Sequence, residues 1–372
     1  MKLSCIKEKF NKGLALTGRL TNLKTTLPVL NNILLKAKNG KLTIISTDLE
    51  IAVKSNIGAK VLKEGSITVP ARLLSDFMAK NQDKKIKISL KENILTIKSR
   101  HSLAHIRGIK ASEFPLIPKI KKGPKISIKS SDLLNSLNKV IVAAAIDDTR
   151  PVLAGVCFKK KGNELKLVAT DSYRLAEKKI KSESFSKIPD FTFIVPLKTS
   201  QELSRVLSIL DPGMVLIKFN ENQVAFQMVG VEIVSRLVEG EFPEYEQIIP
   251  KNFETRAELA PRQFSNTIKM VNLFAEDSAN SIQLNFDQNG EVRVEATSNQ
   301  IGDNKTTLRG KIQGKDNAIA FNAKFIIDGL AVLSQEEGVG FEMTGKYNPG
   351  VLRPDKDKDY LYVIMPLKTD SE

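Results

Sequence analysis

The chain of 372 residues has few of the side chains on which common catalytic and metal sites depend. It contains no tryptophan, two cysteines and two histidines. Two cysteines are too few for a disulfide framework, and a structural zinc site needs about four Cys or His ligands. His101 and His105 lie four residues apart in a strand-like segment, so we favour solvated or half-buried strand residues over a metal pair. They also leave little material for a Ser-His-Asp triad.

Long apolar runs are also missing. No run approaches the roughly 18 residues of a membrane-spanning helix, and the opening MKLSCIKEKF has no long apolar stretch of the kind that a secretory signal needs. We therefore expect a cytoplasmic protein. Apolar residues make up 41% of the chain, enough for buried cores, and the length fits two or three domains.

Nucleotide and catalytic motifs are absent as well. No Gly-Lys pair has the upstream glycine spacing and following Ser/Thr of a P-loop, and no glycine-rich dinucleotide fingerprint occurs. Asp147 and Asp148 form an acidic pair, for which a solvated loop or a helix end is favoured over a metal or acid-base role. We predict a binding protein with no catalytic residues, no metal and no cofactor, rather than an enzyme.

The charge is strongly positive and uneven. Lys and Arg number 57 and Asp and Glu 42, which gives +15. Residues 1–123 hold 25 basic and 8 acidic side chains, a net +17; residues 124–250 have 17 and 16, and residues 251–372 have 15 and 18. A polyanionic partner would explain this charge, and a general bias toward lysine is an equally good alternative.

The chain repeats itself three times. PVLNNILLKAKNGKLTIISTDLEIA (28–52) resembles PVLAGVCFKKKGNELKLVATDSYRLA (151–176), and SIQLNFDQNGEVRVEATSN (281–299) is a weaker third copy. Asp48 and Asp171 follow Thr at the same repeat position. This recurrence favours a structural turn role, in which the carboxylate accepts hydrogen bonds from nearby backbone amides.

A second repeat predicts the helices. Apolar strands end at Pro70, Pro196 and Asn322, each 126 residues from the next, and a segment of helical periodicity follows each one. Ser, Thr or Asn near these starts suits helix capping. Each third also opens with a strand that leads into an amphipathic helix. We predict an α+β fold of three similar domains, 1–123, 124–250 and 251–372, each with two helices on antiparallel strands.

Several motifs together resemble the bacterial DNA polymerase III β subunit, the sliding clamp. They are TLPVLNNILL, TDLEIA, TVPAR, VATDSYRLA, EFPEYEQIIP and YLYVIMPLK, in the correct order from residue 2 to about 368. The resemblance implies a head-to-tail homodimer of three-domain chains, which forms a six-domain ring around double-stranded DNA without reading its sequence. It implies a nucleoid-associated processivity factor. It also implies a pocket where the replicative polymerase, the clamp loader and repair factors dock short linear motifs.

The resemblance and the predicted helices together give candidate DNA-binding cations. By motif match we favour Lys24, Arg72, Arg150 and Lys198. Further candidates on the expected helices and loops are Lys7, Lys12, Lys80, Lys139, Arg205, Arg262 and Lys269. The competing interpretation of each is a solvated cation on a helix face.

The pocket residues follow from the resemblance alone. They are Leu153, Thr170, Ser172, Tyr173, Arg174, Leu175, Pro243, Gln247, Ile248, Asn322, Phe325, Val363, Ile364, Met365, Pro366 and Leu367. Apolar residues in a strand-like segment near the C-terminus are otherwise usually core residues, so that alternative stays open. The alternative function is a related triplicated protein that binds nucleic acid or partners without closing a ring.

Overall fold

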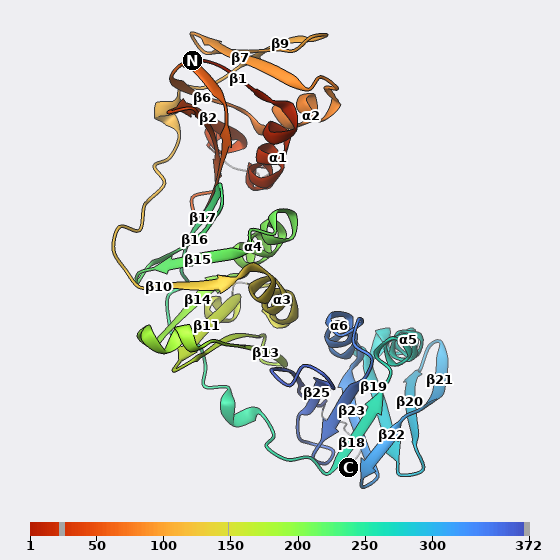
Figure 1. The fold of residues 1–372 in the computed structure, drawn as a ribbon. Coiled ribbons are helices and arrows are strands. Elements are labelled where there is room, and N and C mark those ends of the chain that lie inside the picture. The colour runs from red at the N-terminus through yellow and green to blue at the C-terminus, as the bar shows by residue number, and fades with distance from the viewer. Residues whose placement is uncertain (22–26, 148, 368–372) are drawn as a thin grey trace. The chain divides into compact units, whose positions relative to one another are not determined.

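A computed structural model describes residues 1–21, 27–147 and 149–367. Within these residues the chain forms six α-helices and four antiparallel sheets (Figure 1). The helices are α1 (Lys7–Thr17), α2 (Ala71–Lys80), α3 (Ser130–Val140), α4 (Leu197–Leu210), α5 (Pro261–Asn272) and α6 (Ala323–Val332). The chain packs as two units, 1–131 with 202–237 and 132–201 with 238–372.

The first unit contains two sheets. One has the strand order β5-β1-β7-β8-β9 and the other the order β10-β15-β16-β17-β4-β3-β2-β6. The strands of the first are β1 (Lys2–Ile6), β5 (Lys60–Lys63), β7 (Lys85–Lys91), β8 (Ile94–Lys98) and β9 (Leu103–Arg107). Those of the second are β2 (Asn32–Lys38), β3 (Lys41–Thr47), β4 (Ile51–Gly58), β6 (Gly65–Pro70), β10 (Lys125–Lys129), β15 (Met214–Phe219), β16 (Gln223–Met228) and β17 (Val231–Arg236).

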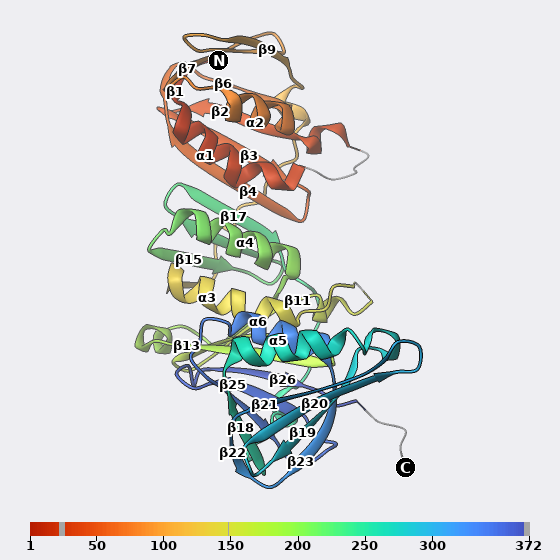
Figure 2. The same ribbon diagram turned by 90° about the vertical axis from the view of Figure 1, so that its right-hand side faces the viewer.

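Helices α1 and α2 close the core of this unit. Phe10 and Leu14 of α1 and Leu74 and Met78 of α2 are fully or almost fully buried, and they join the inward-facing side chains of both sheets in one cluster. Figure 2 shows both helices on one face of the strands β2, β3 and β4. Burial of each such side chain stabilises the fold by about 1.5–3 kcal/mol relative to exposure, so this apolar face fixes the position of the helices.

The second unit contains a nine-stranded and a four-stranded sheet. Their orders are β14-β11-β12-β13-β26-β25-β24-β18-β22 and β21-β20-β19-β23. The larger sheet comprises β11 (Gly155–Lys161), β12 (Glu164–Thr170), β13 (Arg174–Lys181), β14 (Phe191–Pro196), β18 (Thr255–Leu259), β22 (Lys311–Gly314), β24 (Val339–Met343), β25 (Gly350–Pro354) and β26 (Tyr360–Ile364). The smaller comprises β19 (Ser281–Asp287), β20 (Glu291–Ser298), β21 (Gly302–Arg309) and β23 (Asn317–Asn322).

Helices α5 and α6 lie side by side in this unit (Figures 1 and 2). A group of phenylalanines packs beneath them, with Phe341 at 5.5 Å from Phe321 and 6.0 Å from Phe286 between ring centroids. Asn322 caps α6 through its side chain, which accepts a hydrogen bond from Lys324 N at 2.9 Å. The expected polar cap is confirmed there, whereas α2 and α5 follow Pro70 and Ala260 with no side-chain cap.

Strand pairing joins neighbouring thirds of the sequence in the same way twice. In the first unit β17 pairs with β4, with Ser235 opposite Ile51. In the second unit β26 pairs with β13, with Ile364 opposite Arg174. Both ladders are antiparallel, so a strand from a later third extends a sheet of the earlier third.

The predicted α+β architecture with two helices in each third is confirmed. The division at residues 123 and 250 stays a prediction about the sequence repeat, because the packing units do not follow the thirds.

Candidate functional site

A cavity of about 170 Å³ opens in the second unit beside the β12–β13 turn. The turn, the segment after Phe242 and the end of β26 form its walls. Its lining residues are Thr170, Ser172, Arg174, Leu175, Pro243, Glu244, Tyr245, Ile248, Val363 and Met365. The structure therefore brings together half of the predicted pocket residues, from three segments far apart in sequence.

The β12–β13 turn is held by its own side chains. Thr170 Oγ1 donates to the carbonyl of Arg174 at 2.6 Å, and Asp171 Oδ1 accepts from Tyr173 N at 2.9 Å and from Arg174 N at 3.0 Å. Ser172 adopts φ +78°, in the left-handed region. The predicted structural role of Asp171 is confirmed, because its carboxylate closes the turn that borders the cavity.

Arg174 connects this turn to α6 and β26. Its Nε donates to Asp171 Oδ2 at 2.9 Å, its Nη1 donates to Asp328, and its guanidinium carbon lies 4.8 Å from the ring centre of Phe325. Burial acts to lower the pKa of Arg174, but Tyr362, Asp328 and Asp171 together raise that pKa above its ordinary value. Arg174 is thus a fixed cation at the cavity wall.

Tyr245 and Glu244 line the cavity and were missed by the sequence prediction. Tyr245 is buried and donates from its hydroxyl to Glu177 Oε2 at 2.6 Å. Burial, and next the carboxylate of Glu177, raise the pKa of Tyr245 above its ordinary range. The signal was present in FPEYEQIIP, where an aromatic residue follows Phe-Pro, but the partner Glu177 lies 68 residues away.

The other predicted pocket residues are not among the residues that line the cavity. Tyr173 stacks on Phe325 at 6.1 Å between ring centroids, outside the lining. Leu153 and Ile364 are buried core residues, and Asn322 serves as the α6 cap. The remaining members of this group are the partly or fully exposed Gln247, Pro366 and Leu367.

The predicted DNA-binding cations differ in the exposure of their side chains. Lys24 lies outside the described residues. Lys7 is partly exposed and Arg150 exposed, and Arg150 Nη1 lies 3.4 Å from Ser172 Oγ. Cations that are exposed on the helices are Lys12 of α1, Arg72 and Lys80 of α2, Lys198 of α4, and Arg262 and Lys269 of α5.

Two predicted cations are held inside the fold. Lys139 is buried, and its Nζ lies 3.3 Å from Glu336 Oε1 and 2.8 Å from Asp357 Oδ2. Arg205 donates to Glu202 and to the backbone carbonyls of two residues in α1. We therefore remove Lys139 from the candidate DNA-binding set, because a buried and doubly paired ammonium is not available to a phosphate, and we treat Arg205 as structural.

Comparison with known proteins covers nearly the whole chain. Family models for the N-terminal, central and C-terminal domains of the DNA polymerase III beta subunit match residues 1–118, 127–244 and 246–368. A beta sliding clamp from Staphylococcus epidermidis is 30% identical over 379 residues, which cover 99% of this chain and 100% of the relative.

The chain belongs to the bacterial beta sliding clamp family.

Solved clamp structures agree with this assignment. The DNA polymerase III beta subunit of Thermotoga maritima is 27% identical with a TM-score of 0.92, and the alignment covers 99% of each chain. The clamp of Pseudomonas aeruginosa, solved bound to griselimycin, is 26% identical with a TM-score of 0.93, over 99% of this chain and 100% of that one.

The sliding clamp is the processivity factor of DNA polymerase III, and it is a non-catalytic accessory subunit. Its identity implies DNA and a polymerase as partners. No group of three or more potential metal-ligating side chains occurs in the described part of this clamp. Among the same residues, no helix is long and apolar enough to cross a membrane.

Proposed function

We propose that two copies of this clamp close head to tail into a ring around duplex DNA. Family membership carries this proposal, and two open sheet edges support it. Within the described residues, β9 pairs only with β8 and β21 only with β20. Each edge bears an exposed apolar side chain at or beside it, Leu103 and Ile301. An open edge is a template for pairing with another chain.

Net charge also favours contact between unlike ends. Residues 1–123 carry +17 and residues 251–372 carry 15 − 18 = −3. A head-to-tail interface is heterologous, and it forms a closed assembly only if the rotation closes after a fixed number of copies. Light scattering over a dilution series tests this step. A stable mass of about 82 kDa, twice 41.2 kDa, is expected, and a persistent monomer at micromolar concentration would reject the two-chain ring.

The exposed helical cations are the proposed DNA contacts. Lys and Arg side chains that meet phosphates bind without reading sequence, so a clamp can slide along the duplex. Replacement of Lys12, Lys80 and Lys269 by alanine should reduce the slope of log K against log salt by about 0.9 for each phosphate that the variant no longer neutralises. The matched control replaces the exposed Lys41, Lys91 and Lys187 and should leave this slope unchanged.

Retention on circular DNA separates the ring from its alternative. A closed ring stays on a circle and leaves linear DNA through the ends, so cutting the circle should release it. A non-ring binder would respond equally to both forms, and that result would favour the alternative function.

The cavity beside Arg174 is the proposed docking site for short linear motifs of the polymerase, clamp loader and repair factors. Apolar walls of Leu175, Ile248, Val363 and Met365 suit leucine and phenylalanine side chains, and Met365 can adapt to several partners. Arg174 supplies a fixed polar contact.

A matched pair of isoleucines tests the pocket. Ile248 and Ile209 are 41% and 40% exposed, and only Ile248 lines the cavity. Ile248→Asp should weaken binding of a fluorescein-labelled leucine- and phenylalanine-containing pentapeptide at least tenfold, while Ile209→Asp should not. Equal losses would place the peptide elsewhere.

A further inference from the structure

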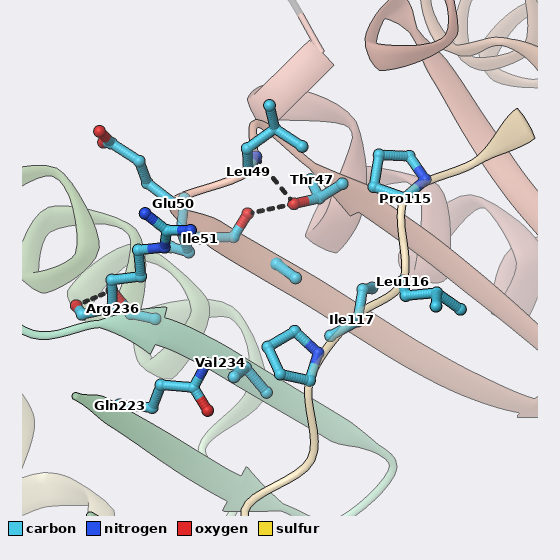
Figure 3. Close-up of a pocket in the computed structure, with 13 residues that line it drawn as sticks. Thr47, Leu49, Glu50, Ile51, Pro115, Leu116, Ile117, Gln223, Val234 and Arg236 are labelled. Atoms are coloured by element: carbon cyan, nitrogen blue, oxygen red, sulfur yellow. Dashed lines mark hydrogen bonds between the residues drawn. The ribbon is translucent and has the colours of Figure 1, made fainter. Parts of the chain in front are cut away.

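A second and larger cavity lies in the first unit, beside the β3–β4 turn (Figure 3). Its volume is about 380 Å³. In Figure 3 the turn lies at the top, the linker that carries Pro115, Leu116 and Ile117 lies at the right, and Val234 of β17 lies below the turn. The lining residues are Thr47, Leu49, Glu50, Ile51, Ala52, Pro115, Leu116, Ile117, Pro118, Gln223, Val234, Ser235 and Arg236.

The β3–β4 turn has the same hydrogen bonds as the β12–β13 turn. Thr47 Oγ1 donates to the carbonyl of Ile51 at 2.9 Å, and Asp48 Oδ1 accepts from Glu50 N at 3.0 Å and from Ile51 N at 2.8 Å. Leu49 adopts φ +82°, as Ser172 adopts φ +78°. Backbone strain at a non-glycine residue costs about 1–3 kcal/mol and concentrates at ligand-binding sites.

The neighbouring ladders put equivalent positions around both cavities. Ala52 faces Val234 as Leu175 faces Val363. Arg236 stands two residues after Val234, and Met365 stands two residues after Val363. Each of them lines the cavity beside it. A Phe-Pro sequence begins the linker wall in each case, at 114–115 and 242–243.

The second cavity is the larger of the two, and its side chains differ from those of the first. Ala52 replaces the larger Leu175, which is consistent with 380 Å³ against 170 Å³. Leu116 is 98% exposed and Leu49 is 50% exposed. Exposed apolar side chains that border a cavity from two sides are typical of an interaction site.

The charges around this cavity favour an acidic occupant. Arg236 is exposed at its edge, and no hydrogen bond or ion pair of its guanidinium occurs among the described residues. Lys119, Lys121 and Lys122 are exposed on the linker directly after Pro118. Glu50 is the one carboxylate in the lining. A carboxylate flanking an apolar anchor would therefore meet several cations.

From these observations we infer that this cavity is a second peptide-docking site, which binds an extended partner segment with large apolar side chains flanked by carboxylates. The inference rests on the proposed function in one respect, since it takes the first cavity as a peptide pocket. Each lining holds one arginine and one glutamate, but Arg174 is paired with Asp171 and Asp328, whereas exposed lysines of the linker follow the wall near Arg236. The first pocket would therefore accept apolar motifs, and the second would select acidic ones.

Methyl-detected NMR of the full-length clamp tests each pocket separately. The probe is a synthetic hexapeptide that alternates aspartate with leucine and phenylalanine, and the control probe carries lysine in place of aspartate. Saturable shifts of the Ile51, Leu116 and Val234 methyl signals with the acidic probe, and at least fivefold weaker binding of the basic probe, are expected. The inference is overturned if these signals do not move, or if both probes shift them equally.

Two surface variants sharpen the result. Leu116→Asp and Arg236→Glu should each weaken the acidic probe at least fivefold, while Leu62→Asp and Arg100→Glu, also exposed in this unit, should not. Shifts of Ile248 and Val363 with the leucine- and phenylalanine-containing pentapeptide report on the first pocket independently. If the pentapeptide moves these two signals and the acidic probe does not move those of Leu116 and Val234, docking at the first pocket stands and the second site fails; the reverse pattern rejects docking at the first pocket alone.

Discussion

The β3–β4 and β12–β13 turns have the same backbone conformation, but they differ in the contacts that their side chains make with other elements. Both carry Thr-Asp, a left-handed third residue and the same hydrogen bonds. In the second unit the fifth residue is Arg174, which is bound to Asp171 and to Asp328 of α6. In the first unit it is the apolar Ile51, and each of these two residues lines the cavity beside its turn. The comparison shows that the repeated turn borders a cavity in both units. The fifth residue of the turn determines whether ion pairs connect that turn to a neighbouring helix.

Removal of the turn carboxylate should give the largest difference in the free energy of unfolding between the two turns. Asp171→Ala loses two backbone hydrogen bonds and a partner of the buried Arg174, so we expect a loss of about 3 kcal/mol. Asp48→Ala loses the same backbone bonds with no buried arginine at the fifth position, for which we expect about 1–2 kcal/mol. Denaturant unfolding measures both, and equal losses would show that Arg174 adds nothing to its turn.

The second contrast concerns charge at the two ladders. Asp357 accepts hydrogen bonds from Lys139 at 2.8 Å and from Lys178 at 2.6 Å in the second unit. In the first unit the half-exposed Lys54 and Glu232 lie 3.5 Å apart. We expect Asp357→Asn to cost about 2 kcal/mol at neutral pH and Lys54→Ala less than about 1 kcal/mol.

This contrast depends on pH in a defined direction. Burial acts to raise the pKa of Asp357, but hydrogen bonds from Lys139 and Lys178 outweigh it and lower that pKa. The carboxylate therefore stabilises the fold fully above its unfolded pKa of about 3.9. That contribution is lost as the pH falls through the lower folded value. Unfolding of wild type and Asp357→Asn from pH 7 to pH 2 should converge at the acid end, and a constant difference would contradict the argument.

Glycine at the left-handed position should give the smallest effect. Leu49→Gly removes the strain of a branched side chain at φ +82°, so we expect stability to change by no more than about +1 kcal/mol. Ser172→Gly should change it by a similar amount. A large loss in Leu49→Gly alone would mean that the exposed leucine packs on the cavity wall and contributes to folding.

Local sequence predicted the elements but not their partners. A proline or asparagine before a segment of helical periodicity predicted α2, α4 and α6, and the Thr-Asp sequence predicted both turns. These predictions succeeded because such helices and turns depend on neighbouring residues. The cavity walls need β17 beside β4 and β26 beside β13, pairs separated by more than 170 residues. Tyr245 was missed for the same reason, and Lys139 was misplaced because its carboxylate partners are about 200 residues away.

These long-range ladders set an order for synthesis. The last residue of β4 is 58 and that of β17 is 236. The edge of β4 that pairs with β17 therefore stays without its partner strand until 178 further residues have been synthesised. β13 waits for 364 − 181 = 183 residues before β26 is complete. At roughly 5–20 residues per second, each edge stays open for about 9–37 s on the ribosome. Lys54 on β4 and the run Glu177, Lys178 and Lys179 on β13 place charges on these waiting strands, which discourages pairing with another nascent chain.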